Sequence, residues 1–364
     1  MADVNSPFSG SYLPEEVSFL MRRMHLETTG LAEREKWIQS GQRHYSEMIG
    51  PEDAPTRARL KLFRKSLMSN GTRLAEDLAT LAAAMAESAV DGELTVVSIA
   101  RAGTPIGVLL WHRIREIAPH LRLKHYSISV IRDRGVDYAA LRWIMARHSP
   151  ASLRFVDGWT GKGTIADELR LSIAAWPAAP HDLDSGLWVP LDVCGAAKFA
   201  ASAQDYLIPS TLLGGTLSGL VSRSVLPSGE EGGEAFHGCV PLDSLRRYDL
   251  SRWFIRKIQS IMQSVPHPVS PVNASAGPLR REETARCLEL MLARHQLSDR
   301  NRIKLGIGET VRVLLRRLPH TIWLGSRTNP TDADLIRRLA ALRNVPVMTD
   351  PDLAFDAIAV IASV

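Results

Sequence analysis

The stretch "RFVDGWTGKGTIADELR", residues 154–170, decides how the first part of this 364-residue chain should fold. An apolar strand ends at Asp157, a turn rich in glycine and threonine follows, and helical spacing begins near Thr164. The glycines of the turn let backbone amides approach a ligand closely, and the helix start adds free N–H groups and a favourable dipole. The stretch therefore predicts a strand–turn–helix cradle for a phosphate, although an ordinary connection would have the same outline.

Strands and helices are expected to alternate on both sides of this stretch. The expected strands are 94–100, 124–131, 153–157 and 187–194, and the expected helices are 106–118 and 163–176. This alternation predicts an α/β fold with a parallel, doubly wound sheet. Because ligands bind at the carboxyl ends of strands in such sheets, we expect a site in the turns after Ala100, Ile131, Asp157 and Asp192.

A segment rich in proline, serine, alanine and glycine, "SVPHPVSPVNASAGPLR" at 264–280, predicts a linker. We therefore expect two domains, at 1–263 and 281–364. Beyond the linker, residues 284–297 have the spacing of an amphipathic helix. A turn, a helix, the strand "HTIWLGS", another helix and the short strand "VPVMT" follow, which together predict a small α/β/α sandwich.

The composition is that of a globular protein: 45% of the residues are hydrophobic, 23% are charged and the net charge is +5. There is no apolar run of the roughly 18 residues that a membrane-spanning helix needs. The first ten residues lack the features of a signal peptide, so we expect a cytoplasmic location. The three cysteines, Cys194, Cys239 and Cys287, are widely spaced and form no metal-binding pattern.

The 154–170 stretch resembles the PRPP loop of type I phosphoribosyltransferases, in which two acidic residues precede a turn of threonine and glycine. Asp157 stands at the second acidic position, whereas Val156 replaces the first. The resemblance implies that PRPP binds here and that Asp157 ligates Mg²⁺ together with oxygens of the substrate. The residues that it implies for phosphate and ribose are Asp157, Thr160, Gly161, Lys162, Gly163 and Thr164.

Two other expected turns resemble parts of the same family. "SIARAGTPIG", residues 98–107, is similar to the pyrophosphate turn, which implies roles for Arg101, Ala102, Gly103 and Thr104. "SVIRDRGVDYAALRW", residues 129–143, stands in the place of the loop that closes over the reaction. The charged, candidate catalytic residues of that loop are Arg132, Asp133, Arg134 and Asp137. Cations suit a transfer in which negative charge builds on a leaving pyrophosphate.

Long motifs make the chain similar to one bacterial family. They are "SGSYLPEEVSFLMRRM" (9–24), "HYSEMI" (44–49), "DYLIPSTLLGGTLSGLVSRSVL" (205–226) and "FHGC" (236–239). The family comprises phosphoribosyltransferase-like proteins of tellurite-resistance and stress gene clusters, which carry the label cysteine protease StiP. A thiol protease needs a cysteine beside a base. Cys239 lies two residues from His237, but sequence neighbours seldom form such a pair.

"KLGIGETVRVLLRR", residues 304–317, resembles the RNA-contact turn of the ribosomal L7Ae and pelota families, whose pattern is G-x-N-E-x-x-K. Gly306, Glu309 and Arg312 match this pattern, and Gly308 replaces its asparagine. The resemblance implies that the glutamate accepts from a base amine and that the arginine takes a phosphate of a kinked RNA. The other basic residues expected on this face are Lys304, Arg316, Arg317 and Arg327. A plain helix start would have the same outline.

The resemblances imply a Mg²⁺-dependent, PRPP-binding phosphoribosyltransferase-like enzyme that acts on a nucleobase, nucleoside or RNA-linked acceptor in a bacterial stress response. RNA, a second copy of the chain and enzymes of the same gene cluster are the expected partners, and no membrane is expected. One alternative is a non-catalytic regulator that senses PRPP or a nucleotide and binds RNA, because only one acidic residue is present in the loop. A thiol protease is a further alternative.

Overall fold

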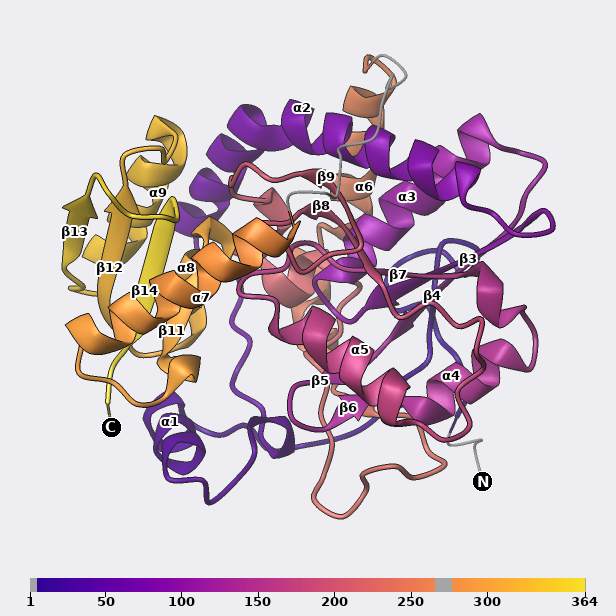
Figure 1. The fold of residues 1–364 in the computed structure, drawn as a ribbon, viewed down its shortest axis with the longest axis horizontal. Coiled ribbons are helices and arrows are strands. Elements are labelled where there is room, and N and C mark those ends of the chain that lie inside the picture. The colour runs from indigo at the N-terminus through magenta and orange to yellow at the C-terminus, as the bar shows by residue number, and fades with distance from the viewer. Residues whose placement is uncertain (1–4, 266–276, 364) are drawn as a thin grey trace.

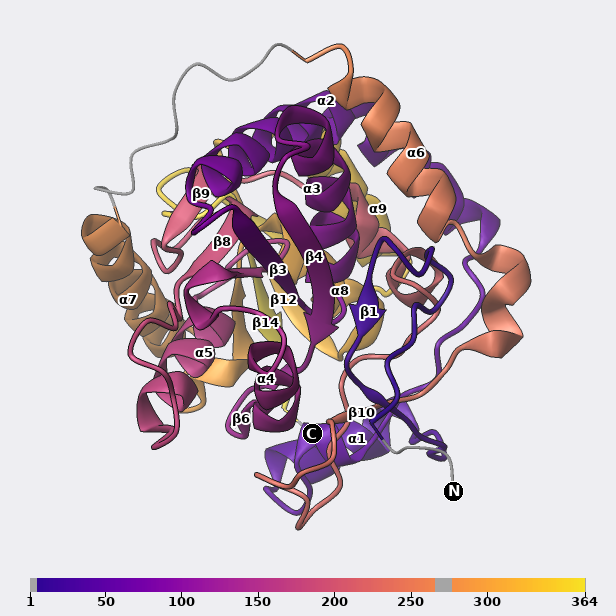
Figure 2. The same ribbon diagram turned by 90° about the vertical axis from the view of Figure 1, so that its right-hand side faces the viewer.

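The fold was analysed in a computed structural model, which describes residues 5–265 and 277–363. Its main sheet has six parallel strands in the order β1-β4-β3-β7-β8-β9 (Figures 1 and 2). In chain order they are β1 (Ser18–Phe19), β3 (Glu93–Ile99), β4 (Arg122–Ile128), β7 (Leu153–Val156), β8 (Leu187–Leu191) and β9 (Phe199–Ser202). The central strands are nearly continuous apolar runs because helices cover both faces of the sheet. The chain adds strands in opposite directions from β3 and β7, so the switch point lies between these two strands.

Helices cover the two faces unequally. Figure 2 shows α2 (Arg57–Glu87), α3 (Gly103–Ile117) and α6 (Ser251–Met262) on one side of the sheet. The shorter helices α4 (Tyr138–Met145) and α5 (Thr164–Ala175) lie on the other. The 31-residue helix α2 starts where the Thr56 hydroxyl accepts from the amide of Arg59. Its buried residues include Leu67, Leu74, Leu78, Leu81 and Met85, the spacing of one helix face.

Smaller elements surround this core. They are α1 (Leu31–Gln39), the two-stranded sheet of β2 (Arg22–Arg23) and β10 (Gly238–Cys239), the hairpin of β5 (Val130–Ile131) and β6 (Gly135–Val136), and the 3₁₀ helices η1 (Tyr45–Glu47), η2 (Pro150–Ser152), η3 (Pro209–Leu212), η4 (Gly214–Leu217), η5 (Asp243–Tyr248) and η7 (Arg300–Arg302). No helix among the described residues is long and apolar enough to cross a membrane.

The C-terminal part forms a second, four-stranded sheet in the order β11-β14-β12-β13. Its elements are α7 (Gly277–Arg294), β11 (Ile303–Leu305), α8 (Ile307–Arg316), β12 (Pro319–Gly325), α9 (Pro330–Ala341), β13 (Val347–Asp350) and β14 (Ala357–Ile361). The strand β14 is antiparallel to both β11 and β12, whereas β12 and β13 are parallel.

The C-terminal sheet and its helices pack against the N-terminal part. Hydrophobic residues of α2, α3, α8 and β14 belong to one continuous core. The carboxylate of Asp332, fully buried at the start of α9, accepts hydrogen bonds from the Asn70 side chain (3.0 Å) and the Leu207 amide (3.0 Å). Arg317 and the fully buried carboxylate of Glu35 form a two-pronged ion pair on another side of the interface. The N-terminal and C-terminal parts of the chain are therefore firmly docked.

The predicted α/β class, the large parallel sheet and the small C-terminal domain are confirmed. The expected strands and helices lie within a few residues of the observed ones, although the strand expected over 124–131 is interrupted before the β5–β6 hairpin. Most of the expected linker, 266–276, lies outside the described residues, and α7 already begins at Gly277. Neither α2 nor β14 was predicted from the sequence.

Candidate functional site

The turns after β3 and β7 meet at the switch point of the sheet, as the parallel order requires. A Cβ at Gly103 would lie only 2.6 Å from the carbonyl oxygen of Val156 and 3.0 Å from the Cα of Asp157. Only a glycine therefore allows the start of α3 to lie against the end of β7. The structure thus brings together two sets of predicted site residues, 101–104 and 157–164.

The glycine turn, residues 158–163, is tied to the next strand end. The Thr160 hydroxyl donates to Oδ1 of Asp192 at 2.7 Å, and Asp192 also accepts from the amides of Cys194, Gly195 and Ala197 at 2.8–3.0 Å. Gly161 and Gly163 have left-handed backbone angles, φ 57° and 90°, which favour glycine. Gly163 is the N-cap of α5, so Thr164 is its first residue. The predicted strand–turn–helix is confirmed.

Asp157 is a buried acid with little to stabilise its charge. Its side chain is 8% exposed, and Oδ1 accepts one hydrogen bond, from the amide of Gly158 at 2.7 Å. Burial raises the pKa of Asp157 to about 7. The described residues contain no group of three or more His, Cys, Asp or Glu side chains arranged as metal ligands. A single carboxyl whose charged neighbours are Arg312 and Glu309 does not fit a protein-held Mg²⁺ site, which needs several oxygen ligands.

The C-terminal turn that precedes α8 lies directly on the glycine turn. The Trp159 indole Nε1 donates to Oε1 of Glu309 at 3.2 Å. A Cβ at Gly308 would lie 3.2 Å from the Trp159 ring, and a Cβ at Gly161 would lie 3.1 Å from Cγ of Glu309. The two motifs that the sequence analysis treated as separate sites, one for a phosphate and one for RNA, therefore form a single composite site.

Cations from both domains gather at this composite site. Burial lowers the pKa of Lys304 to about 7, and burial together with neighbouring Arg132 lowers that of Lys162 to about 8. Lys162 Nζ donates to the carbonyl of Arg300 at 2.7 Å. Arg312 donates to Glu309 at 2.7 Å, yet its side chain is 48% exposed. An anionic group that reached the site would relieve this crowding of positive charge.

The predicted pyrophosphate turn has its side chains directed elsewhere. Arg101 is 8% exposed, pairs with Glu52 and donates to the carbonyl of Val221 at 3.0 Å. Although burial opposes it, Arg101 and Arg316 lower the pKa of Glu52 to about 2. The Thr104 hydroxyl bonds the Ser127 hydroxyl at 2.8 Å inside the core. Of this turn, Ala102 and Gly103 contribute only backbone to the site, so its role with a ligand stays a prediction.

The predicted catalytic loop is the β5–β6 hairpin. The amide of Arg132 donates to the Tyr45 hydroxyl at 2.9 Å, and the Arg132 guanidinium lies 5.1 Å from the centre of the Tyr45 ring. Arg134 pairs with Glu47 at 2.5 Å, and Asp133 is exposed at the tip.

Asp137 has a different, local role. Its buried carboxylate caps α4 through the amide of Ala140 at 2.9 Å and accepts from the amide of His237 at 2.6 Å. Catalysis by this loop stays a prediction, whereas Asp137 has a structural role as the N-cap of α4.

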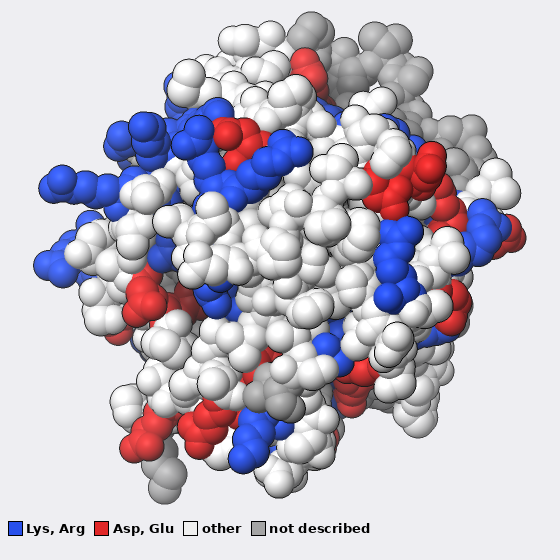
Figure 3. Space-filling view, turned by 90° about the vertical axis from the view of Figure 1, so that its left-hand side faces the viewer, with Lys and Arg blue, Asp and Glu red and all other residues white. Residues whose placement is uncertain are grey.

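Of the expected basic face, Lys304 and Arg312 lie at the composite site, whereas Arg316 pairs with Glu52 at 3.3 Å. Arg317 is instead paired with Glu35, and Arg327 lies 3.5 Å from Asp356. The outer face of the C-terminal domain, seen in Figure 3, has Lys and Arg gathered along one edge and mixed charges elsewhere. The buried turn, rather than a uniformly basic outer surface, is therefore the distinctive cationic feature of this domain.

All three cysteines are buried, and burial raises the pKa of Cys194 and Cys239 to about 12 and that of Cys287 to about 11. His237 does not serve Cys239 as a base, because its Nδ1 bonds the Ser129 hydroxyl at 2.9 Å. Among the described residues, no histidine hydrogen-bonds a cysteine sulfur. Cys194 lies in the composite site, beside Thr160 and the guanidinium of Arg281.

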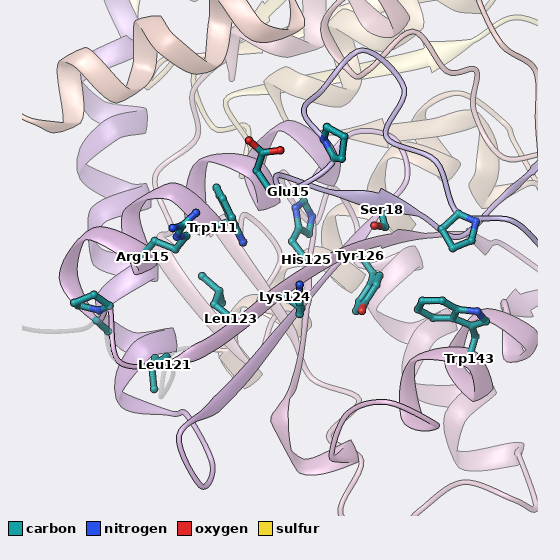
Figure 4. A pocket seen from close by; sticks show the side chains of 14 residues that line it. Glu15, Ser18, Trp111, Arg115, Leu121, Leu123, Lys124, His125, Tyr126 and Trp143 are labelled. Atoms are coloured by element: carbon teal, nitrogen blue, oxygen red, sulfur yellow. The ribbon is translucent and has the colours of Figure 1, made fainter.

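A separate hollow lies at the other edge of the main sheet, along α3 and β4 (Figure 4). Its volume is about 410 Å³, and Trp111, Arg115, Lys124, Tyr126 and Trp143 line it among others. It contains none of the predicted site residues and lies away from the carboxyl ends of the strands. We therefore assign it no role.

Comparison with known proteins gives two family matches and one curated relative. The family described as "Tellurite-like stress resistance cysteine protease StiP" matches residues 10–259. The "PELOTA RNA binding domain" matches residues 282–363. A protein of Acinetobacter baylyi (strain ATCC 33305 / BD413 / ADP1) named "Cysteine protease StiP" is 39% identical over 359 residues, which cover 95% of this chain and 91% of the relative.

These matches correct the sequence analysis. The predicted function, phosphoribosyl transfer from PRPP, is wrong, because the chain's relative and the matching family carry the name of a cysteine protease. The stress-resistance family and the pelota RNA-binding domain were correctly predicted.

Proposed function

Since the chain belongs to the StiP family of stress-resistance proteins and ends in a pelota RNA-binding domain, we propose that it acts in stress resistance by binding RNA. The observation that carries this proposal is the composite site. The turn at the start of α8 presents Glu309 and Arg312 beside the glycine turn of the N-terminal domain. Glu309 and Arg312, with Lys162 of the glycine turn nearby, therefore offer groups that suit a nucleic acid.

The chemistry of each group supports this assignment. The carboxylate of Glu309 can accept hydrogen bonds from a base amine, and Arg312 can pair with a phosphate. Although burial opposes it, Arg312 and Lys304 keep the pKa of Glu309 below its usual value, so this carboxylate is ionised at neutral pH. The 48% exposure of the Arg312 side chain leaves it accessible to an incoming strand.

RNA binding can be tested on the full chain with a fluorescein-labelled RNA hairpin that contains a kinked internal loop. We expect Arg312→Gln to weaken binding about tenfold and to reduce the salt dependence by about one phosphate contact. The matched control is Arg338→Gln, because Arg338 is an exposed arginine of the same domain paired with an aspartate on its own helix. Equal effects of the two substitutions would overturn the assignment of RNA binding to this turn.

A second candidate is the activity in the relative's name, proteolysis by a thiol. One observation favours Cys194 for it: this sulfur lies beside the Arg281 guanidinium, a cation that could stabilise an oxyanion. Its thiolate would add to a peptide carbonyl and release the amine, and water would then release the acid from the thioester. The raised pKa means that the docked conformation disfavours this thiolate, so any such activity needs the site to open.

The proteolysis candidate is tested by comparing Cys194→Ser with Cys287→Ser, which alters a buried cysteine of α7. We expect cleavage of an unfolded casein substrate to be lost only in Cys194→Ser. If cleavage survives both substitutions, Cys194 is not the nucleophile. The same conclusion follows if the wild type does not cleave the substrate with RNA present.

We also propose that the N-terminal sheet is of the type I phosphoribosyltransferase kind, as a fold without the corresponding activity. The strand order around the β3–β7 switch point and the strand–turn–helix at 153–175 support this assignment. An experimental structure whose main sheet had another strand order would refute it. The homodimer and the partner enzymes of a stress gene cluster stay proposals, to be tested by sedimentation and by co-purification.

A further inference from the structure

Three of the four predicted RNA-contact residues of the C-terminal turn are covered by the N-terminal domain. Gly306 lies against the carboxylate of Asp205, whereas Gly308 and Glu309 lie against Trp159. Both covering residues come from loops at the carboxyl ends of the main sheet, Asp205 after β9 and Trp159 after β7. The turn that defines the pelota domain is thus used for contacts within the chain.

Asp205 occupies the start of α8. Its Oδ2 accepts from the amide of Ile307, the first residue of the helix, at 2.8 Å, and a Cβ at Gly306 would lie 3.2 Å from the same oxygen. Helix N-termini bind anions because their first amides are unpaired and the helix dipole favours negative charge. A carboxylate therefore stands where a phosphate oxygen of a ligand would bind.

Trp159 covers the remainder of the turn. A Cβ at Gly308 would lie 3.2–3.5 Å from three atoms of the indole, so the absence of a side chain lets the ring lie flat on the backbone. The indole N–H donates a hydrogen bond to Oε1 of Glu309 at 3.2 Å, and the Arg312 guanidinium lies 5.7 Å from the centre of the Trp159 ring. A flat aromatic ring that donates an N–H to Glu309 takes the place expected of a nucleobase with its amine.

We propose that Asp205 and Trp159 form an internal latch, in which they stand in for a phosphate and a base and keep the RNA-contact turn closed. RNA then binds only when both residues leave the turn. This inference rests on the proposed RNA-binding function and adds its regulation. The latch is local, because Asp332 with Asn70 and Arg317 with Glu35 fix the domains together elsewhere. Opening the latch therefore does not require the domains to separate.

The latch is tested by affinity measurements on the full chain with the fluorescein-labelled kinked RNA hairpin. The variants are Asp205→Ala, Trp159→Ala and the double variant, and Asp352→Ala is the control for loss of one negative charge at an exposed position of the C-terminal domain. We expect each latch variant to bind about tenfold more tightly than the wild type, and the double variant more tightly still. The control should change affinity by less than about threefold, since its effect is only long-range electrostatic.

Hydrogen exchange supplies a readout that does not depend on RNA. The amides of Ile307 and Gly308 should exchange faster in Asp205→Ala, whereas the amides of β12 should keep their protection, which also checks that the variant folds. Slow exchange at Ile307 in Asp205→Ala would mean that the carboxylate does not hold the turn, and this would overturn the latch.

The outcomes separate the latch from the function on which it rests. If the latch variants bind RNA no more tightly than the wild type, while Arg312→Gln still weakens binding, the latch is wrong and RNA binding stands. Weaker binding by Trp159→Ala would likewise overturn the latch, because Trp159 would then contribute to RNA binding rather than block it. If neither the wild type nor any latch variant binds the RNA, the proposed function fails and the latch fails with it.

Discussion

Two glycine-containing turns of this molecule each precede a helix, yet different parts of the chain stabilise them. The turn before α5 is held within its own domain, because Asp192 on the next strand end accepts four hydrogen bonds from the Thr160 hydroxyl and neighbouring amides. The turn before α8 has one hydrogen bond to a strand of its own domain, from the Gly306 amide to the Ala357 carbonyl at 2.8 Å, and its other contacts come from Asp205 and Trp159 of the other domain. A turn held from within keeps its shape whenever its domain is folded, whereas one held from outside depends on the contact.

Asp192 and Asp157, two carboxylates at the ends of neighbouring strands, differ in how many hydrogen-bond donors they have. Asp192 has its oxygens satisfied by donors that the fold supplies, while the buried Asp157 accepts from one amide and has one cation, Arg312, and one anion, Glu309, as charged neighbours. A buried acid without donors costs free energy, and such groups persist mainly where function requires them. The difference marks Asp192 as a residue of the fold and Asp157 as a residue of the site.

The strongest test of this contrast is Asp192→Ala, for which we expect the largest loss of stability. Three amides and one hydroxyl would lose their acceptor, and each unsatisfied buried group costs about 1–3 kcal/mol. The free energy of unfolding in urea should fall by at least about 3 kcal/mol. Asp243→Ala is the matched control, because Asp243 is 72% exposed and forms a surface ion pair with Arg246, so its removal should have almost no effect. Similar small losses in both variants would mean that Asp192 does not organise the turn.

A smaller effect on stability is expected for Asp157→Asn, which should raise the free energy of unfolding at neutral pH. The folded-state pKa of Asp157 is about 7, above the value of about 3.9 in an unfolded chain. The wild type therefore loses stability as pH rises from about 4 to 7, because the unfolded state gives up the proton first. The amide keeps an oxygen for the Gly158 N–H but has no proton to lose.

The unfolding free energy of Asp157→Asn minus that of the wild type should rise across the same pH range and then stay level. Because the two pKa values differ by about three units, the rise should be on the order of a few kcal/mol. Asp243→Asn is the matched control, because it makes the same change at an exposed carboxylate. A difference that is flat between pH 4 and pH 8 would contradict the raised pKa and would leave Asp157 as an ordinary strand-end residue.

The elements that depend on local sequence patterns could be predicted from the sequence. The strand at 153–156, the turn and the helix from Thr164 follow from an apolar run, glycines and helical spacing within 25 residues. The start of α8 was predicted for the same reason. The local pattern at Asp137 was interpreted as catalytic, although an aspartate directly before a helical sequence is also the usual sign of an N-cap.

The composite site was not predictable in this way, because its contacts join distant parts of the chain. Trp159 and Glu309 are 150 residues apart, and Asp205 and Ile307 are 102 apart. Nothing near Asp205 in the sequence distinguishes it from a surface acid after a short strand. The helix α2 was missed although "LAEDLATLAAAMAE" has a clear apolar period, and β14 was missed in the apolar run "AIAVIA", which is too short to separate strand from helix.

The smallest expected effect distinguishes two glycines of one turn, Gly161 and Gly158. Gly161 has a φ of 57°, and an added Cβ would lie 3.1 Å from Cγ of Glu309 in the other domain. Alanine there must strain the backbone and displace the C-terminal turn, so Gly161→Ala should cost about 1–2 kcal/mol. A Cβ at Gly158 would have ordinary contacts, 3.6 Å or more from Ala102, so Gly158→Ala should cost less than about 0.5 kcal/mol.

Thermal unfolding gives the two stabilities, and hydrogen exchange shows where each change acts. Because the contact of Gly161 crosses between domains, its alanine variant should also speed exchange at the amides of Gly308 and Glu309, whereas Gly158→Ala should leave them unchanged. Faster exchange confined to the N-terminal turn would mean that this turn and the turn before α8 are independent. Faster exchange in both turns would mean that the shape of the first helps to hold the second closed, which is the dependence that their different anchoring implies.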